Sequence, residues 1–376
     1  MTPLTAEHLA AAHWTRLVEG ADAVAWELIQ RKGYREALVA CQTGVGLSPA
    51  EKQRAKRWRQ RAESIRPYTA KMIAAMKLQV LIPGDEYWPT QLADLGADCP
   101  LALWVRGDLR ALTRPMLAIV GSRAASHYGQ RIAQDLAYDL ASHFAIVSGG
   151  AFGIDAAAHR GALLAEKPTI IVSAGGADRV YPRAHAQLFV DALAQGGAIV
   201  AESPPNAAPQ RFRFLHRNRI IAALAGATIV VEAPIRSGAL NTARHALALG
   251  RNVGAVPGRV DSPYSMGCHE LLRNNATLVT NSAQVAELAC PIGVTLESTA
   301  PTREEPDFFA GEAEENFDPK QLRVFDAVPV RRSVELAKIA QLAALSIPET
   351  ASALGALQFA GKVMERNGGW VKTSIH

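Results

Sequence analysis

The distribution of apolar residues divides most of the chain into a helical segment and a segment of alternating strands and helices. Residues 1–77 lack the β-branched runs that indicate strands, so they are predicted to form a small helical domain. Between residues 78 and 290, short β-branched runs alternate with Ala/Leu-rich stretches of helical length. The predicted strands are residues 117–120, 144–147, 169–172, 198–200, 228–231 and 252–256. This alternation predicts an α/β core in which helices cover both faces of a parallel sheet.

The last part of the chain has a different pattern. Residues 291–317 form a Pro/Glu-rich linker, and seven acids stand against one base within 293–317. Residues 318–376 show three short helical stretches and then a hairpin signal at Asn367-Gly368. This order predicts a small winged-helix module, with a generic helical cap as the alternative.

Charge and cysteine content narrow the function classes. The 376 residues carry a net charge of +5, and the acidic linker accounts for −6, so the remainder is basic and favours a polyanionic partner. The four cysteines form no Cys-x-x-Cys pair, which disfavours a zinc site and makes the reduced cytoplasm the simplest location. No run of about 18 apolar residues lacks a charge, and charges interrupt the first 30 residues, so neither a membrane span nor a signal peptide is expected.

The loops after the first two predicted strands of the core carry the best candidate anion site. Gly121-Ser122-Arg123 follows one strand, and Ser148-Gly149-Gly150 follows the next. Glycine turns that lead into helices let backbone N–H groups face a phosphate, and ligands of parallel sheets bind at the carboxyl ends of strands. We therefore expect these loops to form one phosphate-binding floor, with Ser237-Gly238 at its rim.

Residues 211–219 alternate cations and aromatic rings and contain no acid. Single-stranded nucleic acid is bound by this combination, because guanidinium groups pair with phosphates and rings stack on bases. The alternative is a solvated arginine-rich turn whose phenylalanines enter the core. The predicted DNA contacts in this segment are Arg211, Arg213, Phe214, Arg217, Asn218 and Arg219.

A second basic stretch, residues 51–71, holds eight bases and two acids. It is predicted to be a solvated helix face, with a nucleic-acid contact as the alternative. The preceding Gly44-Val45-Gly46 is similar to the phosphate-binding turn of helix-hairpin-helix modules, although two glycines are weak evidence.

Several enzyme classes lack their motifs. The glycines after Val120 do not have dinucleotide-binding spacing, and Gly361-Lys362 is not followed by Ser or Thr, so no nucleotide cofactor or triphosphatase activity is expected. Asp155 and His159 lie four residues apart and are predicted to be a capping acid and a structural histidine rather than a catalytic pair or part of a metal site. Glu232 is the best candidate base for the alternative function, an enzyme of the phosphoribohydrolase type acting on a phosphorylated nucleotide.

These motifs together resemble the DprA/Smf family, the DNA-processing proteins of natural transformation. The resemblance covers about residues 80–285 in one order. Its elements include Pro83-Gly84-Asp85, Gly121-Ser122-Arg123, Ser148-Gly149-Gly150-Ala151-Phe152-Gly153-Ile154-Asp155, Tyr181-Pro182, Glu202-Ser203-Pro204, Arg217-Asn218-Arg219-Ile220-Ile221, Ser237-Gly238 and Val256-Pro257-Gly258. The terminal segment is similar to the family's winged-helix module, and the first 77 residues loosely resemble its helical, SAM-like domain.

The resemblance implies a doubly wound, Rossmann-like core that binds and protects single-stranded DNA without hydrolysis and needs no cofactor or metal. It also implies homodimers through the core and loading of the RecA recombinase. The sequence departs from the family pattern at Gly150, His185, Leu215 and His269, so local contacts are expected to differ there. The helix predicted at residues 348–360 has one acid and no base, so the terminal module is expected to contact protein rather than DNA.

Overall fold

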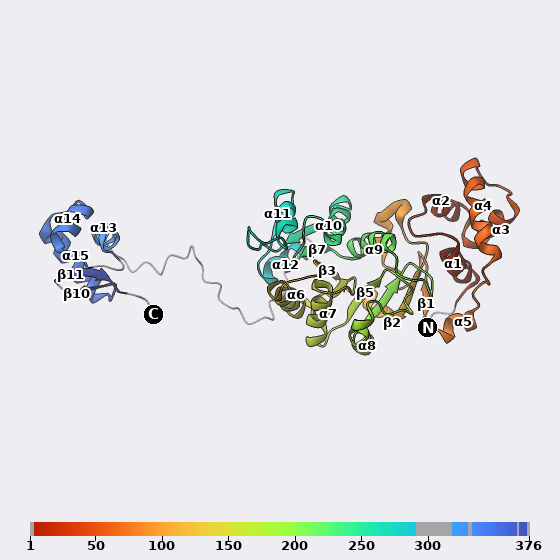
Figure 1. Cartoon of the computed structure of the whole chain (residues 1–376), viewed down its shortest axis with the longest axis horizontal. Coiled ribbons are helices and arrows are strands. Elements are labelled where there is room, and N and C mark those ends of the chain that lie inside the picture. The colour runs from red at the N-terminus through yellow and green to blue at the C-terminus, as the bar shows by residue number, and fades with distance from the viewer. Residues whose placement is uncertain (1–3, 291–317, 330–332, 367, 374–376) are drawn as a thin grey trace. The chain divides into compact units, whose positions relative to one another are not determined.

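The computed structural model describes residues 4–290, 318–329, 333–366 and 368–373, which belong to two compact units (Figure 1). The first unit contains an N-terminal helical bundle and a large sheet, and the second contains the terminal module. The bundle consists of α1 (Ala6–Leu17), α2 (Ala23–Lys32), α3 (Tyr34–Thr43), α4 (Pro49–Glu63) and α5 (Ala70–Ala75). Residues 4–77 contain no strand, as predicted.

A nine-stranded sheet with the order β1-β2-β6-β5-β4-β3-β7-β8-β9 forms the centre of the first unit. The strands are β1 (Gln79–Leu81), β2 (Leu103–Gly107), β3 (Met116–Val120), β4 (Ala145–Ser148), β5 (Thr169–Ser173), β6 (Ala198–Ala201), β7 (Ala227–Val230), β8 (Asn252–Ala255) and β9 (Thr277–Leu278). All strands from β6 to β9 in this order are parallel, whereas β1 and β2 pair antiparallel at one edge. All six predicted strands are confirmed.

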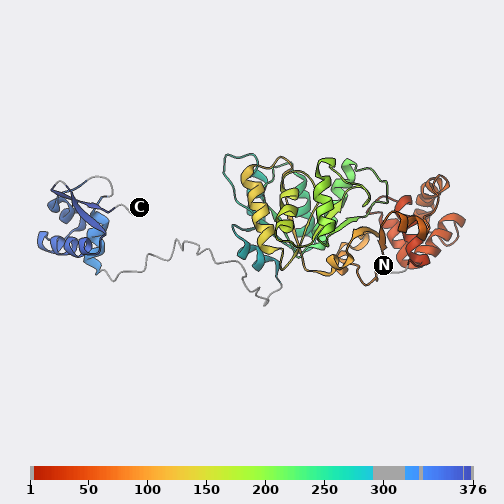
Figure 2. The same cartoon turned by 90° about the horizontal axis from the view of Figure 1, so that it is seen from below.

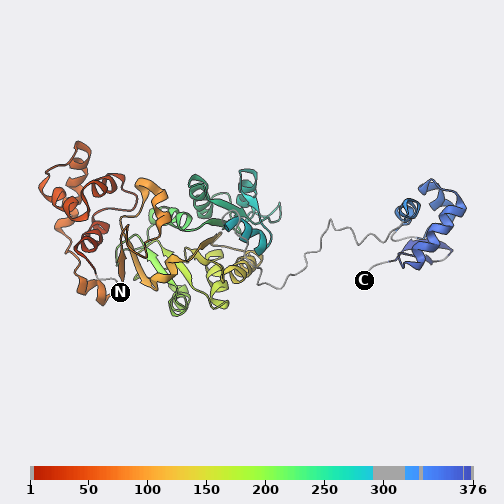
Figure 3. The same ribbon diagram turned by 180° about the vertical axis from the view of Figure 1, so that it is seen from behind.

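Helices cover both faces of the sheet because each strand alternates its buried side chains (Figure 2, Figure 3). Ala118 and Val120 pack with α9, whereas Leu117 and Ile119 pack with α6 and α7. The helices are α6 (His127–Leu140), α7 (Ile154–Leu164), α8 (Ala186–Ala194), α9 (Arg211–Leu224), α10 (Gly238–Ala248), α11 (Met266–Arg273) and α12 (Ser282–Ala289), with 3₁₀ turns at Thr90–Asp98, Leu109–Thr113 and Arg183–His185.

The helical bundle packs directly onto the sheet. Trp104 of β2 is fully buried, and its indole N–H donates to the Thr15 hydroxyl of α1 at 3.1 Å. Trp14 is also fully buried and meets Trp58 edge to face at 5.2 Å. One continuous apolar core therefore joins the bundle to β2 and β6 and sets the position of the bundle relative to the sheet.

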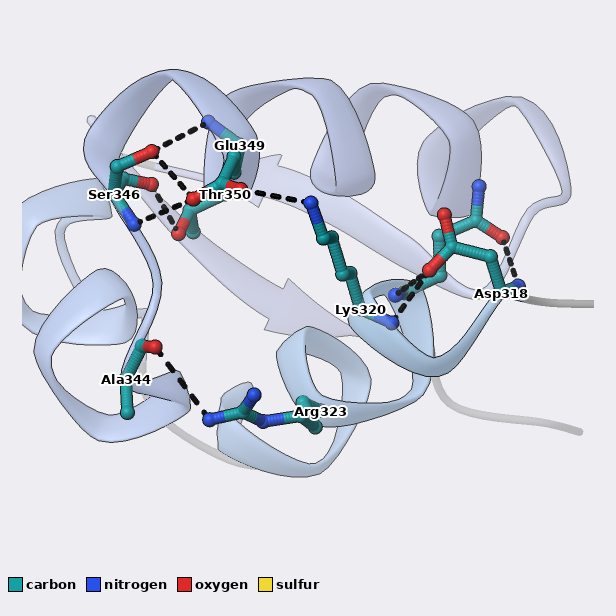
Figure 4. A network of polar contacts seen from close by, with 8 residues as sticks. Asp318, Lys320, Arg323, Ala344, Ser346, Glu349 and Thr350 are labelled. Carbon is teal, nitrogen blue, oxygen red and sulfur yellow. Dashed lines mark hydrogen bonds and ion pairs between the residues drawn. The ribbon is translucent and has the colours of Figure 1, made fainter.

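The second unit contains α13 (Pro319–Ala327), α14 (Leu336–Ala343), α15 (Ile347–Phe359) and a hairpin of β10 (Val363–Arg366) with β11 (Gly369–Lys372). Ser346 caps α15 together with Glu349, and the Glu349 carboxylate also pairs with Lys320 of α13 at 2.8 Å (Figure 4). These contacts of Glu349 hold its pKa at about 2. Three helices followed by a hairpin is the predicted order of elements.

Candidate nucleic-acid interface

The two glycine loops meet because their strands are neighbours in the sheet. β3 and β4 pair in parallel, so Gly121 and Gly149 leave the sheet at the same edge. The backbone N–H of Ile154 donates to the Ser122 carbonyl at 3.2 Å, which ties one loop to the other. The predicted juxtaposition of the loops is therefore present.

The serines of these loops lie inside the protein. The Ser148 hydroxyl is fully buried and donates to the Ile119 carbonyl at 2.7 Å. Ser122 is 5% exposed, and its hydroxyl accepts from the Ala124 N–H at 3.2 Å. Both hydroxyls brace the loops because each satisfies a buried backbone group, and the contact of these serines with DNA stays a prediction.

Asp155 closes the second loop from within. Its carboxylate accepts from the Gly149 and Ala151 N–H groups at 3.1 and 3.4 Å. Burial raises the pKa of Asp155, and Arg217 and the loop amides oppose that rise. These loop amides are thus already engaged. Asp155 lies in the first turn of α7, whose N-cap is Gly153 without a side-chain cap, so the predicted capping role is wrong: the carboxylate holds the loop that precedes the helix.

Arg217 lies beneath the second loop. Its guanidinium donates to the Val172 carbonyl, and a Cβ on Gly149 would overlap the guanidinium and force it to shift. Burial lowers the pKa of Arg217 to about 10, while Asp155 raises it and Arg123 lowers it. Arg217 supports the loop from below and does not reach the surface.

Two further arginines of α9 bond to protein carboxylates. Arg219 is 3% exposed and makes two hydrogen bonds to Glu202, at 2.6 and 3.0 Å. Arg213 makes a similar double contact with Glu19, at the end of α1, at 2.9 and 3.0 Å. Each of these arginines, like Arg217, is engaged inside the unit, and their contact with DNA stays a prediction.

Asn218 also works within the protein. Its amide donates to the Gly238 carbonyl at 3.1 Å and to Asn241 Oδ1 at 3.2 Å. It is 7% exposed and so holds the loop at Ser237-Gly238 against α9. Ser237 itself caps α10 by accepting from the Ala239 N–H, and Gly238 stays exposed beside it.

Arg123 and Arg211 are the exposed cations of the predicted set. The Arg123 guanidinium carbon lies 4.7 Å from the ring centroid of Phe214, which is half-buried. Arg211 begins α9 one turn before Phe214, so helical periodicity places the two on one face. Arg123 and Arg211 are thus the exposed cations near the half-buried Phe214 ring.

Two further aromatic side chains are exposed but were not among the DNA contacts predicted from the sequence. Tyr181 is 47% exposed, and its ring lies 5.6 Å from that of Phe214. Phe152 is also 47% exposed and lies 4.6 Å from the His185 ring. Both can be recognised in the sequence as aromatic residues within strand-end loops. This is evident for Tyr181 in the Tyr181-Pro182 motif, and less evident for Phe152 among the glycines of its loop.

Two of the residues that depart from the family pattern have defined contacts. His185 Nδ1 lies 3.1 Å from the Gly150 carbonyl, and His269 Nε2 lies 3.0 Å from the Gly258 carbonyl. Leu215 is 46% exposed on α9. Each histidine is therefore bonded to the backbone of a neighbouring loop.

The candidate base of the enzyme alternative is engaged as well. Glu232 is 5% exposed, and its carboxylate accepts from the Ser126 N–H at 2.9 Å and the Ser126 hydroxyl at 2.5 Å. His159 is fully buried, and burial lowers its pKa to about 3. Among the described residues, no three acidic, histidine or cysteine side chains gather as a metal site. No helix in the described ranges is long and apolar enough to cross a bilayer.

Comparison with known proteins places this geometry among DNA-processing proteins. The family model for DNA recombination-mediator protein A matches residues 79–289. A putative DNA processing protein DprA of Mycobacterium tuberculosis is 41% identical, with 78% of this chain and 76% of the relative covered. Protein Smf of Escherichia coli is 38% identical, with 78% and 77% covered.

Solved structures give the same result. The X-ray structure of DprA from Streptococcus pneumoniae matches with a TM-score of 0.61 and 30% identity, over 76% of this chain and 98% of that one. A DprA structure from Helicobacter pylori, described as giving insight into single-stranded DNA binding, matches with a TM-score of 0.50 and 31% identity. It covers 56% of this chain and 94% of its own.

Proposed function

Since this chain belongs to the DprA/Smf family of DNA-processing proteins, we propose that it binds single-stranded DNA and leaves it chemically unchanged. The observation that carries the proposal is the Arg123 guanidinium over the Phe214 ring. A cation for phosphate and a ring for a base lie within one nucleotide of each other, which is the combination that single strands require.

The proposed binding surface is smaller than the set that the sequence suggested. It consists of Arg123, Arg211, Phe214 and the backbone of Gly121, with Gly238 at the rim, whereas Gly150 is buried and belongs to the supporting residues. The remaining predicted residues support it from behind: Ser122, Ser148, Gly149, Arg213, Arg217, Asn218, Arg219 and Ser237. Their contacts orient the loops and α9, so their substitution acts on folding before it acts on DNA.

We also propose that the bound strand is protected in the cytoplasm and passed to RecA during DNA uptake, and that the core forms homodimers. Family membership supports both proposals. We propose that residues 318–373 form a winged-helix module, because three helices precede a hairpin. We further propose that this module contacts protein, because α15 has one acid, no base and a 98% exposed Phe359.

A competition titration tests the function. The full chain is titrated with a labelled oligonucleotide and then with unlabelled single strands, blunt duplex and nucleoside monophosphates. We expect single strands of any sequence to compete well, duplex of the same length to compete weakly, and monophosphates to compete least. Duplex that displaces the labelled oligonucleotide as effectively as single strands of the same length would contradict the proposal.

The enzyme alternative has its own measurement. Glu232 already accepts two hydrogen bonds from Ser126 in a buried position, so it is poorly placed to take a proton from a substrate. A hydrolase activity on a phosphorylated nucleotide would support the enzyme alternative if the activity copurifies with the protein and is absent from the Glu232→Gln variant. Loss of folding in that variant is checked by circular dichroism.

A further inference from the structure

Helix α4 presents a basic surface that the proposed single-strand site does not use. Glu51, Ala55 and Trp58 are 4%, 0% and 2% exposed and pack the helix into the bundle. The helix begins at Pro49 behind a Ser48 cap that forms a reciprocal capping box with Glu51. The exposed bases of the rest of the helix are Lys52, Arg54, Lys56, Arg57 and Arg61.

These positive charges are not neutralised within the protein. Glu51 is buried and its carboxylate pairs with Arg31 at 2.7 Å. Glu63, the other acid of α4, is its last residue. In the described part of the chain, no ion pair engages Lys52, Arg54, Lys56 or Arg57.

This arrangement costs helix stability. Lys52 and Lys56 lie four residues apart, as do Arg57 and Arg61, and such like-charge pairs destabilise a helix. Arg61 donates a hydrogen bond to the Leu17 carbonyl. Because a carbonyl carries no charge, the positive charge of Arg61 is not neutralised. A polyanion would relieve the repulsion.

The bases occupy two flanks of the exposed side of α4. By helical periodicity, Lys52 and Lys56 lie on one flank, and the three arginines lie on the other. Gln53 and Gln60, both exposed, are seven residues apart and lie between the flanks. The helix thus has a polar, uncharged ridge with a row of cations on each side.

We propose that α4 is a second nucleic-acid site and that its ligand is duplex DNA. A helix is about 10–12 Å wide, and the major groove is about 12 Å wide, so cations on both flanks face the two phosphate backbones. The glutamines of the ridge then face base edges, where glutamine pairs with adenine. A single strand offers one backbone and leaves one flank without a partner.

The composition of α4 separates this ligand from an anionic membrane. Helices that bind membrane surfaces place Trp, Phe or Leu on a face that enters the lipid. The single large apolar residue of α4, Trp58, is 2% exposed and packs against Trp14. Figure 1 shows α4 on the outer side of the bundle, where a duplex can approach it.

The test uses the full chain with four substitutions, Lys52→Gln, Arg54→Gln, Lys56→Gln and Arg57→Gln. The matched control removes four exposed bases elsewhere: Lys71→Gln, Lys77→Gln, Arg160→Gln and Arg273→Gln. Binding of a blunt duplex and of a short single strand is measured by fluorescence anisotropy across a salt series. The two double variants, Lys52/Lys56 and Arg54/Arg57, replace the quadruple one if its thermal melt shows unfolding.

The α4 variant should lose at least tenfold in duplex affinity, and its log–log salt slope should fall by about 3–4, because each phosphate contact contributes about 0.9. Its single-strand affinity and the duplex affinity of the control set should stay within twofold of the unmodified protein. Arg123→Ala should show the reverse selectivity, so failure of the single-strand site is distinguished from failure of this one.

Three results would overturn the proposal. One is a duplex affinity equal in the α4 and control variants, and another is an equal loss for duplex and single strand in the α4 variant. The third is loss of binding to vesicles that contain phosphatidylserine, without any change in duplex binding, which would assign the surface to a membrane.

Discussion

The guanidinium of Arg123 lies over the ring of Phe214, with its carbon 4.7 Å from the ring centroid. Arg123 belongs to the loop after β3, and Phe214 belongs to α9, so the contact joins two segments far apart in the sequence. A cation near a ring face is held by the ring quadrupole, at about 0.5–1 kcal/mol for an exposed site. Arg123 is therefore held near the position where it would meet a phosphate.

Arg123→Ala should lower the affinity for all single strands alike. The loss of one phosphate contact should reduce the log–log salt slope by about 0.7, because fewer counterions are released on binding. Fluorescence anisotropy at several salt concentrations measures both quantities, with Arg160→Ala as the control for net charge. An unchanged slope in a folded Arg123→Ala variant would place Arg123 outside the site.

Phe214→Ala should weaken binding by about 1–3 kcal/mol, the range for one stacked base, with little change in salt slope. Phe214→Tyr should keep most of the affinity because it retains the ring. Isothermal titration with homopolymeric oligonucleotides measures the change. A variant that loses affinity for one base type only would show that the contact reads sequence.

Arg219→Ala should lower the unfolding free energy of the protein rather than remove a direct contact with DNA. It leaves the Glu202 carboxylate unpaired in a mostly buried position, which costs about 3–5 kcal/mol of unfolding free energy. Replacing both partners, Arg219→Met with Glu202→Leu, should recover much of this loss. Urea unfolding of the three proteins measures it. Unchanged stability together with lost DNA affinity would make Arg219 a direct contact.

Acidification should destabilise the protein through His159. Thr169 donates its hydroxyl to Ile146, so the His159 Nδ1–H donates to Thr169, and Nε2 has no partner within the described residues. Burial lowers the pKa of His159 to about 3, so the unfolded chain binds a proton below pH 6.5 that the folded chain refuses.

The free energy of unfolding should therefore fall as pH falls from 6.5 toward 3. Between pH 6.5 and 5 the loss of unfolding free energy caused by His159 approaches about 2 kcal/mol. His159→Asn keeps a donor for Thr169 and removes the titrating group, so its stability should depend less on pH. Parallel pH profiles for the two proteins would contradict this assignment.

A chain that ends at Cys290 should keep its single-strand affinity within about threefold. It retains α12 and the whole sheet, and it removes an acidic segment that repels phosphate, together with α15, which has no base. Oligonucleotide titration of the shortened and full chains measures the difference, after a thermal melt confirms folding. A hundredfold loss, about 2.7 kcal/mol, would make the terminal unit part of the binding site.

The sequence alone determined six strands of the sheet and the position of the candidate strand-end loops. The six predicted strands form because their β-branched residues are buried on both faces of the sheet. Short β-branched runs in the local sequence indicate such strands. β1, β2 and β9 were not predicted, because β1 and β9 have only three and two residues and the extended form of β2 depends on antiparallel pairing with β1 and β6. The strand-end loops were located because parallel strands bring their carboxyl ends to one edge.

Only the tertiary structure decided which side chains of residues 211–219 remain exposed. The local pattern shows four arginines of similar chemistry, but their partners Glu19, Val172 and Glu202 come from distant segments that no local spacing reveals. Phe214 meets the Arg123 guanidinium and Arg211 stays exposed, whereas packing directs Arg213, Arg217 and Arg219 to protein carboxylates and carbonyls. The sequence thus determined which side chains are available at this edge of the sheet. Folding determined which of them are buried and which remain exposed, because a buried guanidinium must find its acceptors inside the protein.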